Sequence, residues 1–135
     1  MTISQIRIGK AQRALVIDDD KFMLAVLGDM LRDLGVAQVS TAANGAAGMA
    51  AIARAPLPPD VVLCDLNMPG TDGFEVMEQL AARNFGGGVV LVSGMDDRIR
   101  NSAMLMARFH GLNILATLDK PVNEAALGSA LAKLN

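Results

Sequence analysis

Short apolar runs alternate with stretches of helical periodicity along the chain. Five runs have the length and composition of buried strands: RALVID (13–18), AQVSTA (37–42), VVLCD (61–65), VVLVS (89–93) and NILATLD (113–119). Apolar residues recur at helical spacing in the five intervening or following stretches: 21–34, 45–55, 74–81, 97–110 and 123–134. Gly35 marks the end of the first helix, and the prolines of residues 55–60 exclude a helix there.

This alternation predicts an α/β fold in which a parallel sheet carries helices on both faces. Right-handed crossovers leave few topologies, and a doubly wound five-stranded sheet of order 2-1-3-4-5 is the natural one. The 135 residues are enough for one domain. We therefore predict a single domain over residues 13–134, preceded by a loose leader over residues 1–12.

Composition narrows the classes of function. Hydrophobic residues make up 52% of the chain and the net charge is -2, which argues against disorder and against direct nucleic-acid binding. No apolar run is long enough for a membrane span, and Cys64 has no second cysteine to pair with. We expect a soluble cytoplasmic protein. The absence of Trp and Tyr argues against aromatic stacking on a base or flavin.

Polar residues gather where the predicted strands end. In a doubly wound sheet, functional groups collect at the carboxyl ends of the strands, near the switch point between the first and third strands. Four of the five predicted strands end in such residues: Asp18, Asp19 and Asp20; Asp65; Ser93; and Asp119 with Lys120. These side chains are expected to share one rim of the sheet.

Crowded carboxylates repel one another and require a cation, and ligands that are all oxygen favour Mg²⁺ or Mn²⁺. A carboxylate beside such an ion and a lysine can act as a nucleophile toward phosphorus. Lys120 would neutralise charge on the incoming group, Ser93 would donate a hydrogen bond to it, and Gly94 leaves space for it. A single strand-end Asp is usually a helix cap or a turn former. The joint occurrence favours Asp65 as a phosphoryl acceptor, whereas the lone His110 is expected to be a surface residue at a helix end.

The segments LVIDDD, VVLCDLNMPGTDGFE, VVLVSG and LDKPV, in this order, resemble the receiver (CheY-like) domain of two-component response regulators over about residues 13–134. The resemblance implies that Asp65 accepts a phosphoryl group from a sensor histidine kinase or a phosphotransfer protein. It implies that Ser93 and Lys120 contact the phosphate. The ligands it implies for Mg²⁺ are Asp19, Asp65, the main-chain carbonyl of Asn67 and, through water, Asp18. Asp20 is expected to start the following helix.

Two features depart from the family pattern. Thr117 stands three positions before the lysine, where the family usually has an aromatic switch residue. The switch is therefore expected to involve Ser93, Gly94 and the helix 97–110 rather than a moving ring. The stretch from Ser93 to Lys120 is also longer than expected, and it is similar to receivers joined to cyclic-di-GMP phosphodiesterase domains.

A helical wheel of residues 97–110 predicts which side faces the sheet. Met104 projects nearly opposite that side and Leu105 lies on its flank, so both are candidates for a contact with a second copy or an output domain. Scattered surface apolar residues are the simpler interpretation. The residues assigned to the sheet side are Ile99, Ala103, Met106 and Phe109.

Two other classes of function use related features. A haloacid-dehalogenase-like phosphatase also has a strand-end Asp nucleophile, but it needs a second Asp two positions later as general acid, where this chain has Asn67. A flavodoxin-like module of the same fold would carry a chromophore. The predicted last helix reaches the end of the sequence, which leaves open a stand-alone receiver or a piece of a longer regulator.

Overall fold

A computed structural model describes residues 11–68, 73–94 and 97–134, except for the side chains of residues 97, 99, 100, 103, 105, 107 and 109. The strands are β1 (Arg13–Ile17), β2 (Gln38–Ala42), β3 (Val61–Asp65), β4 (Gly88–Ser93) and β5 (Asn113–Asp119). The helices are α2 (Lys21–Asp33), α3 (Gly45–Arg54), α4 (Gly73–Ala82), α5 (Asp97–His110) and α6 (Glu124–Leu131). Each predicted element is present, although the last helix ends at Leu131 instead of residue 134.

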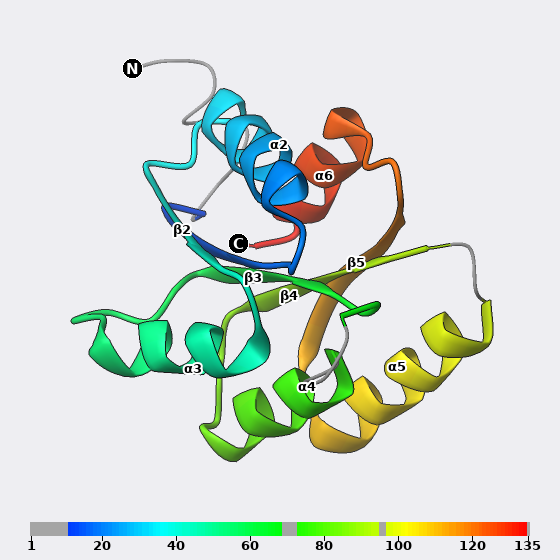
Figure 1. Cartoon of the computed structure of the whole chain (residues 1–135). Helices are drawn as coiled ribbons and strands as arrows, with labels where there is room; N and C mark the ends of the chain where they lie inside the picture. The colour runs from blue at the N-terminus through cyan, green and yellow to red at the C-terminus, as the bar shows by residue number, and fades with distance from the viewer. Residues whose placement is uncertain (1–10, 69–72, 95–96, 135) are drawn as a thin grey trace.

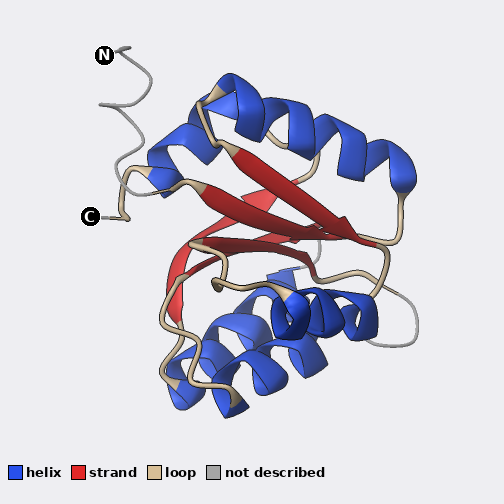
Figure 2. Cartoon of the chain, turned by 90° about the vertical axis from the view of Figure 1, so that its left-hand side faces the viewer, coloured by secondary structure: helices blue, strands red, loops and turns tan. Residues whose placement is uncertain are grey.

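The five strands form one sheet of order β2-β1-β3-β4-β5, and every neighbouring pair is parallel. This confirms the predicted doubly wound α/β fold. Helices α2 and α6 cover one face of the sheet, and α3, α4 and α5 cover the other (Figures 1 and 2). Each face has its own hydrophobic core, because side chains of a strand alternate between the two faces.

The strand sequences follow from their places in the sheet. All residues of β3 and β4 are buried, because these central strands are covered on both faces, and their sequences are accordingly almost entirely apolar. Strand β2 lies at the sheet edge, and three of its five residues are exposed. The only buried polar or charged residues among those described lie where strands end: Asp18, Asp65 and Ser93.

Local capping residues set the bounds of the first two helices. The side chain of Asp20 accepts a hydrogen bond from the Phe22 main-chain N–H at 2.9 Å, which confirms Asp20 as a helix-start residue. Gly35 has a φ of 98°, a left-handed conformation that glycine adopts at little cost, and it follows the end of α2 as predicted. Asn44 caps α3 by accepting from the Ala47 N–H at 2.7 Å.

The predicted loose leader over residues 1–12 extends too far, because residues 11 and 12 are part of the packed domain. Ala11 is fully buried. The main-chain N–H of Gln12 donates to Asp60 Oδ2 at 2.9 Å, and its carbonyl accepts from the Gln38 N–H at 2.9 Å. These two residues therefore belong to the packed domain, and residues 1–10 lie outside the described part of the chain.

Helix α4 begins in close contact with the end of β3. A Cβ atom placed on Gly73 would lie 3.0 Å from the Leu66 Cα and 3.2 Å from the Asp65 carbonyl oxygen. Both of these neighbours are main-chain atoms, which cannot rotate away as a side chain can. Gly73 thus allows the chain to return to the sheet directly after Asp65.

This packing predicts that Gly73→Ala lowers the free energy of unfolding by roughly 1–3 kcal/mol, because the added methyl group overpacks the backbone. Gly86→Ala is the matched control, since a Cβ there would meet no atom of the described residues within 4 Å. It should leave stability unchanged or slightly raised. Urea unfolding of both variants measures the difference. Equal stabilities would show that the contact at Gly73 relaxes without cost.

Candidate functional site

Hydrogen bonding between adjacent strands brings the predicted site residues to one edge of the sheet. Asp65 at the end of β3 pairs with Val92 of β4, and Ser93 at the end of β4 pairs with Asp119 of β5. The Lys120 main-chain N–H then donates to the Ser93 carbonyl oxygen at 2.9 Å. The ends of β3, β4 and β5 are thereby held side by side.

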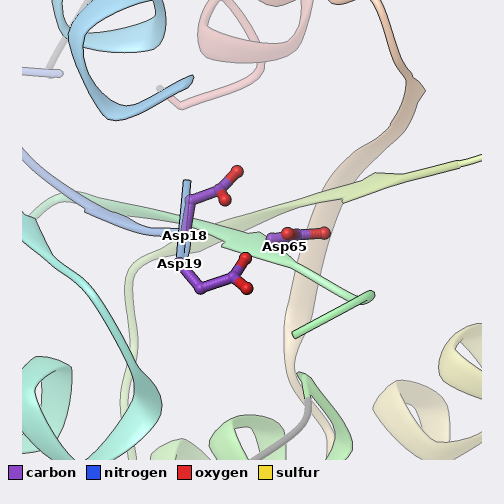
Figure 3. A group of neighbouring side chains, drawn as sticks. All are labelled: Asp18, Asp19 and Asp65. Carbon is purple, nitrogen blue, oxygen red and sulfur yellow. The ribbon is translucent and has the colours of Figure 1, made fainter. Parts of the chain in front are cut away.

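Three carboxylates converge at this edge. Asp18 and Asp19 follow β1, Asp65 ends β3, and each offers an oxygen atom within 4.8 Å of the others (Figure 3). Asp18 and Asp65 are almost completely buried, with 1% and 2% of their surface exposed, whereas Asp19 is exposed. The predicted cluster is therefore formed, with two members removed from solvent.

Among the described side chains, Lys120 supplies the positive charge nearest to the buried pair. Its Nζ atom lies 3.1 Å from Asp65 Oδ2 and 3.9 Å from Asp18 Oδ2. One ammonium group cannot balance three carboxylates, so the site retains negative charge when all three are ionised. The lysine contacts Asp65 more closely than Asp18, which leaves Asp18 the less compensated of the buried pair.

The titration of Asp18 reflects this imbalance. Burial of its carboxyl group raises its pKa from 3.8 to about 6, and the nearby charge of Asp65 adds to the rise. Opposing these effects, the Asp20 main-chain N–H donates to Asp18 Oδ1 at 2.9 Å and Lys120 lies nearby, and both favour the ionised form. Protonation of Asp18 thus relieves repulsion in the site.

The available ligand atoms fit a hard divalent cation. They are carboxylate oxygens, the donors that Mg²⁺ prefers, and no imidazole or thiol belongs to the cluster found among the described residues. Asp18 Oδ2 and Ser93 Oγ are buried without a hydrogen-bond partner in the described structure. Buried polar atoms are normally paired, so two such orphans at one edge favour a bound group that would satisfy them.

Asn67 connects two loops of the site through its side chain, which the sequence did not indicate. Its main-chain N–H donates to Asp65 Oδ1 at 2.9 Å. Its side-chain Oδ1 accepts from the main-chain N–H of Gly94 at 2.9 Å. An Asn-to-glycine pair separated by 27 residues leaves no signal in the sequence pattern, because the contact depends on how two loops meet.

The predicted orientation of Met104 is wrong. Its Sδ atom accepts a hydrogen bond from Thr117 Oγ1 of β5 at 3.3 Å, and its side chain packs against the core under α3, α4 and α5. Met106 packs against the same core. Helix α5 contacts both β5 and α4, so its buried arc is wider than the single sheet-facing side assumed on the wheel. The side chain of Leu105 lies outside the described structure.

The chain matches the family described as "Response regulator receiver domain" over residues 14–132. A protein-glutamate methylesterase/protein-glutamine glutaminase of Symbiobacterium thermophilum is 32% identical over 128 residues, which are 94% of this chain and 34% of that protein. A protein of the same description from Natronomonas pharaonis is 50% identical over 62 residues, or 46% of this chain and 17% of that protein. A solved response regulator from Colwellia psychrerythraea is 28% identical with a TM-score of 0.76, covering 93% of this chain and 97% of that one.

The fold and the strand-end site define a doubly wound α/β protein with an acidic edge. With the family match over most of its length, the chain belongs to the receiver domains of two-component response regulators, which are signalling phosphoacceptors. This sets aside the phosphatase and chromophore-binding alternatives.

The chain spans about a third or less of the length of the methylesterases it matches. The finer similarity to receivers joined to cyclic-di-GMP phosphodiesterases stays a prediction. No helix in the described part is long and apolar enough to span a membrane.

The raised pKa of Asp18 predicts how stability depends on pH without divalent cations. Between pH 4 and pH 6 the unfolded chain releases the Asp18 proton while the folded protein retains it, so this group's contribution is lost as pH rises through about 6. The total loss is about 3 kcal/mol. Asp18→Asn should therefore be more stable than wild type at pH 7.5, and the difference should shrink below pH 6.

Urea unfolding at pH 5 and pH 7.5 in the presence of a chelator tests this expectation. Asp33→Asn, at an exposed position on α2, is the control and should show no such change with pH. A stability difference between Asp18→Asn and wild type that is constant from pH 5 to pH 7.5 would contradict the assignment.

Proposed function

We propose that Asp65 is the phosphoacceptor of this receiver domain and that a sensor histidine kinase or a phosphotransfer protein is its donor. The observation that carries this proposal is the contact between the buried Asp65 carboxylate and Lys120, 3.1 Å apart beside two further carboxylates. A buried carboxylate with one oxygen held by the Asn67 N–H and the other by an ammonium group is fixed for attack.

In the proposed transfer, a carboxylate oxygen of Asp65 forms a bond to phosphorus while the bond from phosphorus to the donor nitrogen breaks. The donor histidine keeps the electron pair of that bond, and the aspartyl phosphate is the product. Lys120 offsets negative charge that gathers on the phosphoryl oxygens. The hydroxyl of Ser93, buried and without a partner, would donate to one of those oxygens.

Mg²⁺ fits the carboxylate cluster, although Mn²⁺ would suit the same ligands. Asp19, Asp65 and the main-chain carbonyl of Asn67 would hold the ion directly, and Asp18 would do so through water. When bound, the ion supplies positive charge to the transferring phosphoryl group.

We infer no turnover reaction beyond phosphorylation from small donors and hydrolysis of the protein's own aspartyl phosphate. We also propose that the protein is cytoplasmic.

We further propose that the phosphorylated state is transmitted through the loop after Ser93 and through α5. Thr117 cannot bury a ring as the family's usual aromatic residue does, but its hydroxyl bonds to Met104 of α5. A shift of β5 would therefore be passed to α5 directly. A homodimer or output-domain contact on α5 remains our proposal. Met104 is no longer suited to serve it, because its sulfur is directed to β5.

Incubation with Mg²⁺ and acetyl phosphate should add one phosphoryl mass to the wild-type protein, as measured by intact-protein mass spectrometry. Asp65→Asn should gain none, because the amide is not a nucleophile toward phosphorus. Lys120→Ala should still bind Mg²⁺ but respond poorly to phosphorylation. Asp60→Asn is the control, since its carboxylate bonds to the backbone at Gln12 and Arg13, away from the site. Labelling of Asp65→Asn at another residue would contradict the assignment.

Amide chemical-shift changes on phosphorylation should concentrate in residues 93–112. The physical reason is that the Ser93 hydroxyl is expected to contact the phosphate and that α5 is bonded to β5 through Met104. Two-dimensional NMR of the labelled protein before and after phosphorylation measures this distribution. Changes of equal or larger size confined to α3 would argue for a different route.

A further inference from the structure

We propose that the side-chain carbonyl of Asn67 and a phosphoryl group on Asp65 compete for one donor, the main-chain N–H of Gly94. Asn67 would thereby set the balance between the unphosphorylated and phosphorylated conformations. This inference rests on the proposed phosphorylation of Asp65. It assigns Asn67 a positioning role for its side chain, in addition to the main-chain carbonyl expected to bind the cation.

The competition follows from where the two hydrogen bonds of Asn67 lie. Its N–H reaches Asp65 Oδ1 and its Oδ1 reaches the Gly94 N–H, each at 2.9 Å. The residue before Gly94 is Ser93, whose hydroxyl is buried without a partner in the described structure, and Val92 before it pairs with Asp65 across the sheet. The Gly94 N–H, to which Asn67 is bonded, therefore belongs to the peptide bond that follows Ser93. Ser93 is the residue whose hydroxyl is expected to contact the phosphate.

A phosphoryl group is the stronger acceptor of the two. It carries a charge of roughly −1.5 to −2 and three acceptor oxygens, whereas the Asn67 amide is neutral. Hydrogen bonds to a charged acceptor are roughly twice as strong as those between neutral groups. Once Asp65 is phosphorylated, the Gly94 N–H should therefore leave Asn67 and turn to a phosphoryl oxygen.

The surroundings of the hydrogen bond between Gly94 and Asn67 also allow it to break and be replaced by another. The Asn67 side chain is exposed, so its carbonyl can bond to water after release. A Cβ atom placed on Gly94 would meet Asn67 Oδ1 alone, at 3.7 Å, among the described atoms within 4 Å. No tight packing around Gly94 in the described structure resists the change, so the cost is close to that of one hydrogen bond.

Beryllofluoride, a stable mimic of a phosphoryl group on a carboxylate, provides the test. Asn67→Ala removes the competing acceptor, so its affinity for beryllofluoride at saturating Mg²⁺ should be about 2- to 10-fold tighter than that of wild type, the worth of one net hydrogen bond. Asn44→Ala is the matched control. It also removes an Asn oxygen from a backbone N–H, that of Ala47, but at the remote start of α3, and should leave the affinity unchanged.

Hydrogen exchange of the Gly94 amide, followed by NMR, separates this role from a merely structural one. Without beryllofluoride, Asn67→Ala should exchange this amide several-fold faster than wild type, because its acceptor is missing. Asn67→Asp keeps an oxygen at that place and should restore protection. With beryllofluoride bound, wild type and Asn67→Ala should exchange it at the same rate, since both then use the same new acceptor.

The outcomes distinguish this inference from the proposed function. A wild-type protein that takes up neither a phosphoryl mass nor beryllofluoride at Asp65 would remove the proposed function itself. Tight binding of beryllofluoride by wild type, with equal or weaker affinity in Asn67→Ala, would remove the competition alone. Exchange of the Gly94 amide that is unaffected by Asn67→Ala in the free protein would do the same.

Discussion

The burial of Asp18 and Asp65 side by side, with Lys120 as the nearest cation among the described side chains, is the constraint on which the site depends. Ionised carboxylates are costly to bury and repel one another. Lys120 compensates Asp65 at 3.1 Å but reaches Asp18 at 3.9 Å, and burial raises the Asp18 pKa to about 6. The negative charge of the site is therefore not fully balanced. A site with excess negative charge stabilises an added cation more than an electrically neutral site would. In the proposed function, the same excess of negative charge would make an incoming phosphoryl group dependent on Lys120 and on that cation.

The doubly wound fold makes this arrangement possible. Central strands covered on both faces must be apolar, and β3 is buried from Val61 to Asp65. Polar chemistry is therefore confined to the edge where strands end. Parallel hydrogen bonding then brings residues that are far apart in sequence, such as Ser93 and Asp119, to one level at that edge. The helices on both faces keep the interior of the sheet dry, so charges placed at its rim interact in a medium of reduced polarity.

Two side-chain contacts join the site to the rest of the molecule. Asn67 links the loop after β3 to the loop after β4, and Thr117 links β5 to Met104 of α5. Both are single hydrogen bonds, each of modest strength, and the acceptor in the second is a thioether sulfur, which accepts weakly. Contacts of this strength can be exchanged at little cost when a charge is added nearby. If Asp65 is phosphorylated as we propose, they would connect the change in charge there to the elements that we expect to carry the response.

The sequence by itself determined the order of elements, the parallel sheet and the strand-end residues Asp18, Asp19, Asp65, Ser93 and Lys120, because periodicity and strand ends are local features. It also indicated Asp20 as a helix start and Gly35 as a helix end. It failed on Met104, whose orientation depends on the packing of α5 against both β5 and α4. The bond between Asn67 and Gly94 was likewise decided by tertiary structure, since it requires two loops to meet at one edge. Local pattern reports which face of an element is apolar, but only the packed chain decides which polar groups come within hydrogen-bond distance.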